Sequence, residues 1–98
     1  MFTHLVFIWL KEGTPAADKD SLLHDCREML KEIPSLHLSA GTPAMTPREV
    51  VDNSYDVGLC TIFKDKAGHE AYQVHPAHKA FVAKHKQHWA KVIIYDFE

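Results

Sequence analysis

The stretch that decides the fold of this chain is Phe2-Thr3-His4-Leu5-Val6-Phe7-Ile8-Trp9-Leu10. It contains neither Gly nor Pro and is rich in β-branched and aromatic residues, so it predicts a β-strand. Successive side chains of a strand point to opposite faces of a sheet. One face carries His4, Val6, Ile8 and Leu10, and the other carries Leu5, Phe7 and Trp9. Because both faces are largely apolar, we expect both to be covered in the folded protein.

A helix is predicted after this strand. Thr14 is expected to be its N-cap and Pro15 its first helical residue, and Pro34 ends the segment. The apolar residues in between keep helical spacing, which predicts one buried helix face. These residues are Leu22, Cys26, Met29, Leu30 and Ile33.

Two further strands and a long loop are predicted in the middle of the chain. Leu36–Ala40 alternates apolar and polar residues, as a half-buried strand does. Gly41–Ser54 contains two Pro and several polar residues, which indicates a loop. Tyr55–Phe63 predicts the third strand. One face of that strand is expected to carry Tyr55, Val57, Leu59, Thr61 and Phe63.

The last third of the chain predicts two helices and a strand. Asp65 is placed to cap a helix over Lys66–Val74, with Ala67, Ala71 and Val74 on one side. Pro76 disfavours helical geometry at the preceding residue, so the chain should bend there. Pro76 can then open a further helix that reaches about Trp89. Val92–Phe97, again apolar on both faces, predicts the last strand.

The resulting order, β-α-β-β-α-(α)-β, is the ferredoxin-like split βαβ arrangement of the α+β class, with a four-stranded antiparallel sheet. Helices on one side of such a sheet leave its other face bare. The first and last strands nevertheless supply apolar residues to both faces, and another copy of the chain can cover the bare one. The sequence therefore predicts a homodimer in which two sheets pack face to face.

Composition narrows the functional classes. The 98 residues are expected to form a single domain over residues 1–98, and a net charge of −2 gives no argument for a nucleic-acid partner. No apolar run approaches the roughly 18 residues that cross a bilayer, so no membrane partner is expected. The apolar opening follows Met1 without a basic leader and indicates a strand rather than a signal peptide. Cys26 and Cys60 fit neither a metal-site spacing nor a disulfide framework, which favours reduced thiols in a cytoplasmic protein.

The segment Ala71–Phe81, with the sequence AYQVHPAHKAF, resembles the Y-x-x-H-P-x-H-x-x-F core of the stress-responsive A/B barrel (Dabb) family. The resemblance extends to His4-Leu5-Val6-Phe7, the turn at Gly41, Tyr55-Asp56 and Ile94-Tyr95-Asp96-Phe97, and so covers essentially the whole chain. It implies a ferredoxin-like protomer and a dimeric α/β barrel. Enzymatic members resemble plant polyketide cyclases of the olivetolic acid type, in which the tyrosine and the second histidine of this motif do the chemistry. That resemblance assigns catalysis to Tyr72 and His78.

The residues themselves support this assignment. His78 is the third residue of a helix opened by Pro76, where the positive end of the helix dipole favours a neutral imidazole, a competent general base. Tyr72 can donate a hydrogen bond to a carbonyl or enolate oxygen. Helical spacing places His78 on one inward stripe with Phe81, Val82, His85 and Trp89. We therefore predict proton abstraction next to a carbonyl group, as in an aldol-type ring closure.

The rest of this predicted site consists of wall residues and structural residues. The walls are expected to be Val6, Ile8, Leu23, Cys26, Leu59, Thr61 and Phe81, with His4 as a further polar group. His75 and Pro76 are interpreted as structural, with His75 as a helix cap. His78 and Tyr72 have a purely structural interpretation too, since a histidine between helices often only packs and hydrogen-bonds a carbonyl.

Other functional interpretations remain open. His75/His78 and His85/His88 are i, i+3 pairs that can bind a divalent ion, but no Cys or carboxylate supports them, so neither a metal site nor a cofactor is predicted. The last helix is basic at Lys79, Lys84, Lys86 and Lys91, which would attract a carboxylate or a coenzyme A thioester. The alternatives to an enzyme or small-molecule binder are a non-catalytic stress or assembly protein and, more weakly, a monooxygenase-type barrel.

Overall fold

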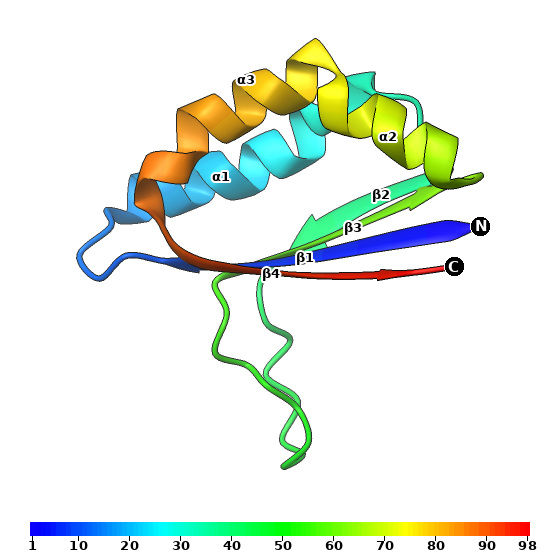
Figure 1. Ribbon diagram of the computed structural model, residues 1–98. Coiled ribbons are helices and arrows are strands. Elements are labelled where there is room, and N and C mark those ends of the chain that lie inside the picture. Colours follow the sequence, from blue (N-terminus) through cyan, green and yellow to red (C-terminus); the bar gives the residue numbers. More distant parts are fainter.

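The computed structural model describes residues 1–98 as a layer of helices lying on one face of a sheet (Figure 1). The strands are β1 (Phe2–Leu10), β2 (His37–Gly41), β3 (Val57–Phe63) and β4 (Trp89–Phe97). The helices are α1 (Ala16–Glu28), α2 (Lys66–Val74) and α3 (Pro76–His85), with 3-10 turns at Leu30–Glu32 and Lys86–His88. All strand pairs are antiparallel, in the order β2-β3-β1-β4. This is the predicted ferredoxin-like α+β fold. No helix in it has the length and the apolar character of a membrane span.

The central strand β1 has the two apolar faces that the sequence predicts. It pairs with β3 on one side and β4 on the other. The face that carries His4, Val6 and Ile8 is buried beneath the helices. The opposite face, with Phe7 and Trp9, is only partly buried.

The hydrophobic core lies between the buried face of the sheet and the three helices. Each helix contributes to it: Leu22 and Cys26 come from α1, Tyr72 from α2 and Phe81 from α3. Full burial of such a side chain stabilises the fold by about 1.5–3 kcal/mol. The strand β3 contributes Val57, Leu59, Thr61 and Phe63, all buried, as predicted.

The first helix differs from its prediction at both ends. Thr14 does not cap it, because its hydroxyl donates to the carbonyl of Lys11 at 2.6 Å, and Pro15 occupies the N-cap position. The α-helix ends at Glu28, and a 3-10 turn replaces its expected last part. Leu30 remains buried, since the tighter turn keeps its side chain on the core side.

The last helix is shorter than predicted, and β4 begins earlier. The helix α3 ends at His85, and Trp89 is the first residue of β4 rather than the last of a helical stripe. Trp89 pairs with Leu10, and the Lys11 amide donates to the His88 carbonyl at 2.8 Å. Pairing with β1 therefore overrides the helical spacing of the sequence, a local preference that tertiary contacts readily outweigh.

Three smaller predictions, on the position or burial of single side chains, are wrong. Tyr55 lies before β3 and packs on Phe7, with ring centroids 5.0 Å apart, so it belongs to the open face of the sheet. Leu36 precedes β2, and its side chain is exposed. Val74 faces solvent with 65% of its surface exposed, because α2 buries Tyr72 instead. The predicted Asp65 cap is confirmed by the bond that its Oδ1 accepts from the Gly68 amide at 3.0 Å.

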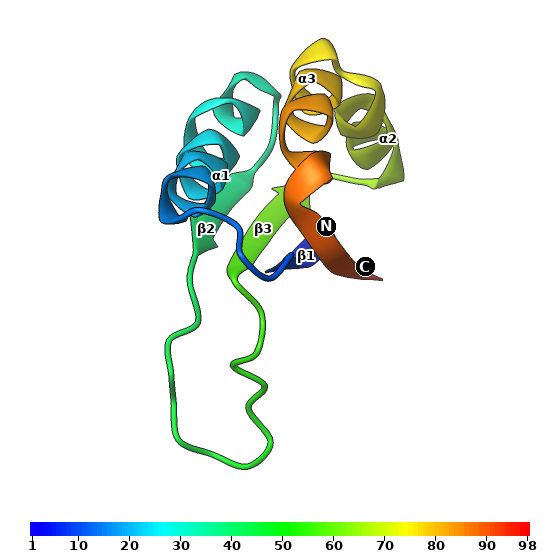
Figure 2. The same ribbon diagram turned by 90° about the vertical axis from the view of Figure 1, so that its left-hand side faces the viewer.

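The sheet face opposite the helices is uncovered and apolar. Aromatic side chains from β1, β4 and the segment before β3 meet there, with Phe7 between Tyr55 and Tyr95. The loop of residues 42–56 projects from the sheet on this same side, away from the helices (Figure 2). Met45 and Val50 in this loop are exposed. The sequence analysis assigns this sheet face to a second copy, and the loop adds exposed apolar side chains beside it.

A buried ion pair joins α1 to α3. His85 Nε2 donates to Asp25 Oδ2 at 2.6 Å, and Lys84 Nζ lies 2.7 Å from the same oxygen. Burial raises the pKa of the Asp25 carboxyl, but the hydrogen bonds and charges of Lys84 and His85 outweigh it and hold the pKa below its ordinary value of 3.8. Asp25 therefore stays ionised and links two helices that cover the sheet.

We expect Asp25→Asn to lower the free energy of unfolding by about 1.5–3 kcal/mol, because the charged hydrogen bonds of a buried carboxylate are lost. Since the folded pKa of Asp25 is depressed, its contribution is complete above pH 3.8 and is lost as the pH falls further. Urea unfolding followed by circular dichroism at pH 7 and pH 3 measures both effects. Lys84→Met, at a half-exposed position, should cost less; a larger loss in this control would contradict the assignment.

Candidate functional site

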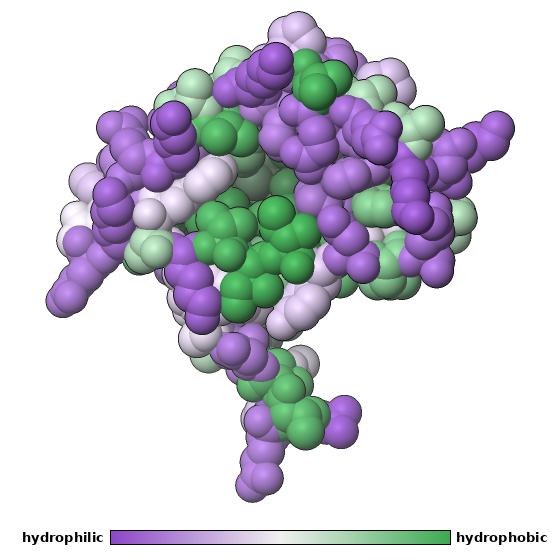
Figure 3. Space-filling model, viewed as in Figure 1, coloured by the Kyte–Doolittle hydropathy of each residue, from purple (hydrophilic) through white to green (hydrophobic).

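A cavity of about 140 Å³ lies between the sheet and the helices α2 and α3. It opens at the β4 edge, where Ile94 is 50% exposed and Val92 is 39% exposed. Figure 3 views the molecule from this side and shows hydrophobic surface gathered around a hollow. The lining residues are His4, Val6, Ile8, Leu59, Tyr72, Gln73, His78, Phe81, Val82, Trp89, Val92 and Ile94.

The structure brings most of the predicted site residues together around this cavity. The predicted pair Tyr72 and His78 is joined there by predicted wall residues from β1, β3 and α3 and by the further polar group His4. Three other predicted wall residues, Leu23, Cys26 and Thr61, do not line it. Leu23 and Cys26 belong to α1, which packs over β2 and β3, whereas the cavity lies toward β4. Thr61 lies on β3 and is buried away from the cavity.

Five lining residues were not named as walls by the sequence analysis. Gln73, Val82, Trp89, Val92 and Ile94 come from α2, α3 and β4. Val92 and Ile94 pair with Ile8 and Val6, and residues that pair directly share a face of the sheet. Recognising β4 as the neighbour of β1 would have identified these two positions from the sequence.

Tyr72 and His78 lie side by side across the junction between α2 and α3. Their ring centroids are 4.8 Å apart at an interplanar angle of 54°. The bend at Pro76 separates the two helices and turns His78 toward Tyr72. His75 caps α3 by accepting a hydrogen bond from the Ala77 amide at 3.0 Å, and Pro76 is the first residue of α3. The structural interpretation of His75 and Pro76 agrees with this geometry.

The protonation states of this pair suit an acid–base partnership. Burial lowers the pKa of His78, opposed by the Gln73 backbone, and the nearby His4 and His69 lower it further. His78 is therefore a neutral imidazole at pH 7, able to accept a proton. Burial, with a smaller effect of Cys26, raises the pKa of Tyr72 well above its ordinary value of 10.0. Tyr72 is therefore a hydrogen-bond donor and not a base.

A further donor borders the same cavity. The indole N–H of Trp89 is buried and has no hydrogen-bond partner within the protein. A buried donor without a partner costs free energy, so an acceptor on a bound ligand would stabilise it. Sequence analysis missed this feature because it placed Trp89 at the end of a helix.

The four lysines of the predicted basic helix do not form one continuous basic surface. Lys84 pairs with Asp25, and Lys91 lies over the ring of Trp9 on the open face of the sheet. Lys79 and Lys86 line a shallow depression that also includes His78. Only these two lysines are placed to attract an anion toward the cavity.

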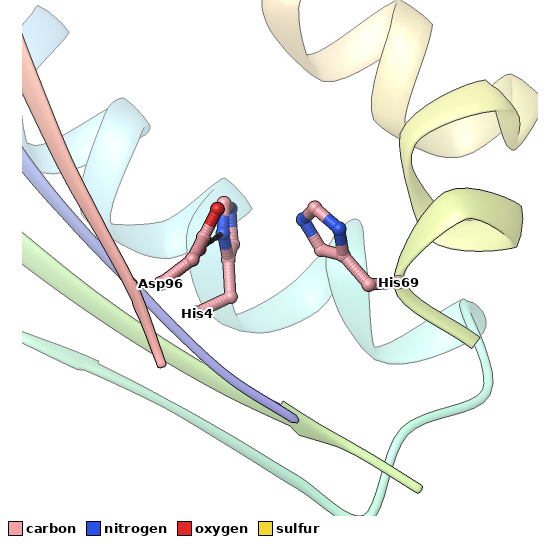
Figure 4. Close-up of side chains that lie close together, drawn as sticks. All are labelled: His4, His69 and Asp96. Carbon is pink, nitrogen blue, oxygen red and sulfur yellow. Dashed lines mark hydrogen bonds and ion pairs between the residues drawn. The ribbon is translucent and has the colours of Figure 1, made fainter. Parts of the chain in front are cut away.

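One histidine of each i, i+3 pair has a structural role. His75 caps α3 and His85 is paired with Asp25. A different group of three possible metal ligands, His4, His69 and Asp96, lies next to Tyr72 (Figure 4). His4 Nδ1 is 2.5 Å from Asp96 Oδ1. The sequence analysis missed His69 and Asp96, since no spacing along the chain relates them to His4.

Both the sequence and the fold of this chain are similar to those of known proteins. The family model described as Stress responsive A/B Barrel Domain matches residues 2–98. A Dabb family protein with a ferredoxin-like fold from Mesorhizobium loti is 25% identical, with a TM-score of 0.80 over 99% of this chain and 94% of that one. A dimeric ferredoxin-like protein of unknown function from Thermobifida fusca is 18% identical, with a TM-score of 0.82 over 98% and 88% of the two chains.

A similar structure with a named activity is the hydroxynitrile lyase from Passiflora edulis. It is 14% identical, with a TM-score of 0.80 over 98% of this chain and 90% of that chain. At this identity the likeness shows a common fold only. No curated protein matches the sequence.

We expect Tyr72→Ala to lower the free energy of unfolding by about 3–5 kcal/mol, because the ring is 2% exposed and packs on Phe63 and His78. Tyr72→Phe keeps the ring and removes the hydroxyl, which takes no part in the hydrogen bonds of the core, so it should cost less than about 1 kcal/mol. Urea unfolding of both variants measures the difference. Equal losses would show that the hydroxyl is a structural group.

Proposed function

This chain belongs to the stress-responsive A/B barrel (Dabb) family, and we propose that it is a homodimer that binds a small carbonyl compound and abstracts a proton next to the carbonyl group. The observation that carries the proposal is the contact between Tyr72 and His78 at the cavity. One member of the pair is a neutral base and the other a protonated donor. Enolate formation needs both groups within reach of one substrate.

In the proposed reaction, an imidazole nitrogen of His78 accepts the proton from the carbon next to the carbonyl group. The electron pair of the C–H bond moves to the carbonyl oxygen and forms an enolate. The Tyr72 hydroxyl donates a hydrogen bond to this oxygen while its charge develops. The imidazolium of His78 then returns a proton to the product, so the enzyme is regenerated without a co-reactant.

The size of the cavity limits the substrate. Ligand sites for drug-sized molecules usually measure roughly 300–1,000 Å³, whereas a cavity of roughly 150 Å³ accommodates benzene. The cavity of about 140 Å³ therefore suits one six-membered ring or a short carbonyl compound. Any larger substrate would extend past the partly exposed side chains of Val92 and Ile94 at the β4 edge.

Self-association of this chain is supported by its open sheet face and by its relatives. Similar structures from Thermobifida fusca, Bacteroides fragilis and a Jannaschia species are described as dimeric. The open face is apolar and aromatic, as an interface between copies of one chain requires. Packing two such faces together would bury Phe7 and Tyr95 of each copy and bring the loop of residues 42–56 against the other chain.

A second candidate function is a non-catalytic stress or assembly role. It is favoured by the extent of the open face and by the exposed Met45 and Val50 in the projecting loop, which are suited to association rather than chemistry. The lyase from Passiflora edulis favours the enzymatic proposal, because it has an activity on the same fold. Exchange of a substrate proton distinguishes the two functions.

We expect the purified protein to catalyse hydrogen–deuterium exchange at the methyl group of acetophenone, a small ring-bearing ketone, as followed by NMR in D₂O. His78→Ala should reduce the exchange rate by roughly 10²–10⁴-fold, the usual contribution of a general base. Tyr72→Phe should reduce it while leaving the fold unchanged. Because the pKa of His78 lies below 6.5, exchange should persist at pH 6.5 and be lost as the pH falls further.

The control is His37→Ala, at an exposed position on β2 whose side chain bonds only Ser39. This variant should exchange at the wild-type rate. Exchange that is equally fast with His78→Ala, in a variant that elutes at the wild-type volume, would reject His78 as the base. Absence of exchange in the wild type across a set of small ketones would favour the non-catalytic function.

We expect Phe7→Glu to convert the dimer to a monomer at micromolar concentration, because two-fold symmetry places a buried, unpaired charge on each side of the interface. Size-exclusion chromatography with light scattering measures the mass. Val74→Glu is the matched control, since Val74 is an exposed apolar residue on the helix layer. Dissociation of the Val74 variant, or an unchanged mass of the Phe7 variant, would place the interface elsewhere.

A further inference from the structure

Three side chains from three elements meet at the end of the sheet where both termini lie. His4 comes from β1, His69 from α2 and Asp96 from β4 (Figure 4). We propose that they form a binding site for a divalent transition-metal ion of the Zn²⁺ class. This site is separate from the proton-transfer proposal and would exist whether or not the protein is an enzyme.

The sheet register brings two of the three ligands together. His4 and Asp96 are direct partners in the antiparallel pairing of β1 and β4, so their side chains project from the same face. His4 is buried, whereas the Asp96 side chain is 37% exposed. The carboxylate can therefore rotate about its own bonds without disturbing the core.

The third ligand is held by aromatic contacts rather than by hydrogen bonds to the sheet. The His69 ring stacks on Phe2, with centroids 4.4 Å apart and planes 20° from parallel. A second contact to Phe63, at 5.7 Å, limits its tilt. The centroids of His69 and His4 are 4.6 Å apart. The imidazole is thus positioned before any ion arrives, which reduces the entropic cost of binding.

The spacing of the possible ligand atoms is close to that of a metal site. One atom from each side chain can be chosen so that all three lie within 4.8 Å of one another. Ligands about 2.0–2.2 Å from a tetrahedral Zn²⁺ are about 3.3–3.6 Å apart. Small rotations of Asp96 and His69 would close the longest separation and open the 2.5 Å contact between His4 and Asp96.

The ligand types select the ion. Two imidazole nitrogens and one carboxylate oxygen suit Zn²⁺ and neighbouring first-row ions, whereas Mg²⁺ and Ca²⁺ prefer oxygen ligands alone. Three protein ligands also leave a fourth position open, as in catalytic rather than structural zinc sites. His4 lines the cavity, so the ion would lie beside the proposed substrate site.

One ring nitrogen of His69 faces the other two ligands. Figure 4 shows this nitrogen to be Nε2, the one remote from the attachment of the ring to the backbone. The side-chain amide of Gln73 lies 3.0 Å from the same Nε2. A bound ion would therefore take the place of the Gln73 amide on this nitrogen.

The simpler interpretation is that Asp96 only orients His4 through their hydrogen bond. It explains His4 and Asp96 but assigns nothing to His69. The two interpretations differ in whether the loss of His69 changes the affinity for metal ions. His69→Phe tests this directly, since phenylalanine preserves the stacking on Phe2 and Phe63 and removes both nitrogens.

The experiment titrates ZnCl₂ into untagged, chelator-treated protein by isothermal titration calorimetry, with Co²⁺ absorption as a second readout of coordination. We expect one ion per chain. His69→Phe and Asp96→Asn each remove a direct ligand and should each weaken Zn²⁺ binding by more than about 100-fold. Loss of an outer-shell partner costs less, roughly 10–100-fold. Gln73→Ala should not weaken binding, because it removes a group that competes with the ion for Nε2 of His69. His88→Ala, which lies on a different part of the surface, should bind as the wild type does.

Binding that is unchanged in both His69→Phe and Asp96→Asn, or no binding in the wild type, would overturn the proposal. Circular dichroism and elution volume of each variant confirm that the fold is retained. If His69→Phe does not fold, the Zn²⁺ affinity of Asp96→Asn, a change at an exposed position, tests the proposal alone. Hydrogen–deuterium exchange of acetophenone by the metal-free protein shows whether the proposed function fails independently.

Discussion

The structure depends on the central position of β1. This strand pairs with β3 and β4 and carries apolar side chains on both faces. The helices cover only one of these faces, so β1 is at the same time part of the core and part of an uncovered surface. A strand that was apolar on one face would support the same protomer but would give no reason for a second copy.

The same strand places a polar group in the core. His4 lies on the covered face, between the core residues Phe2 and Val6, and is buried. Its hydrogen bond to Asp96 satisfies one ring nitrogen at the end of the sheet. A buried polar group needs such a partner, and the polar side chains of the covered face gather at this end of an otherwise apolar layer. Tyr72 and His69 of α2 complete that end, and His78 of α3 extends it toward the β4 edge.

The proposed proton-transfer pair and the proposed metal site share this environment but make different demands on it. Burial keeps His78 neutral and Tyr72 protonated, which suits a base and a donor. Burial also lowers the pKa of His69, which packs against the same rings. One physical cause, the removal of water from a cluster of aromatic and imidazole rings, is the largest cause of all three shifts.

The sequence by itself determined the features that depend on neighbouring residues. The two-faced strand, the cap at Asp65, the bend at Pro76 and the cap at His75 all follow from local geometry, and the structure agrees with each. The Tyr72–His78 pair was also predicted, because both residues lie within one short motif that a family resemblance brings out. Only the tertiary structure decided that Trp89 begins a strand, that Leu23, Cys26 and Thr61 lie away from the cavity, and that His69 and Asp96 join His4. These features depend on which strand lies at the edge of the sheet and which helix covers it, and such contacts join residues far apart in the chain, where periodicity carries no information.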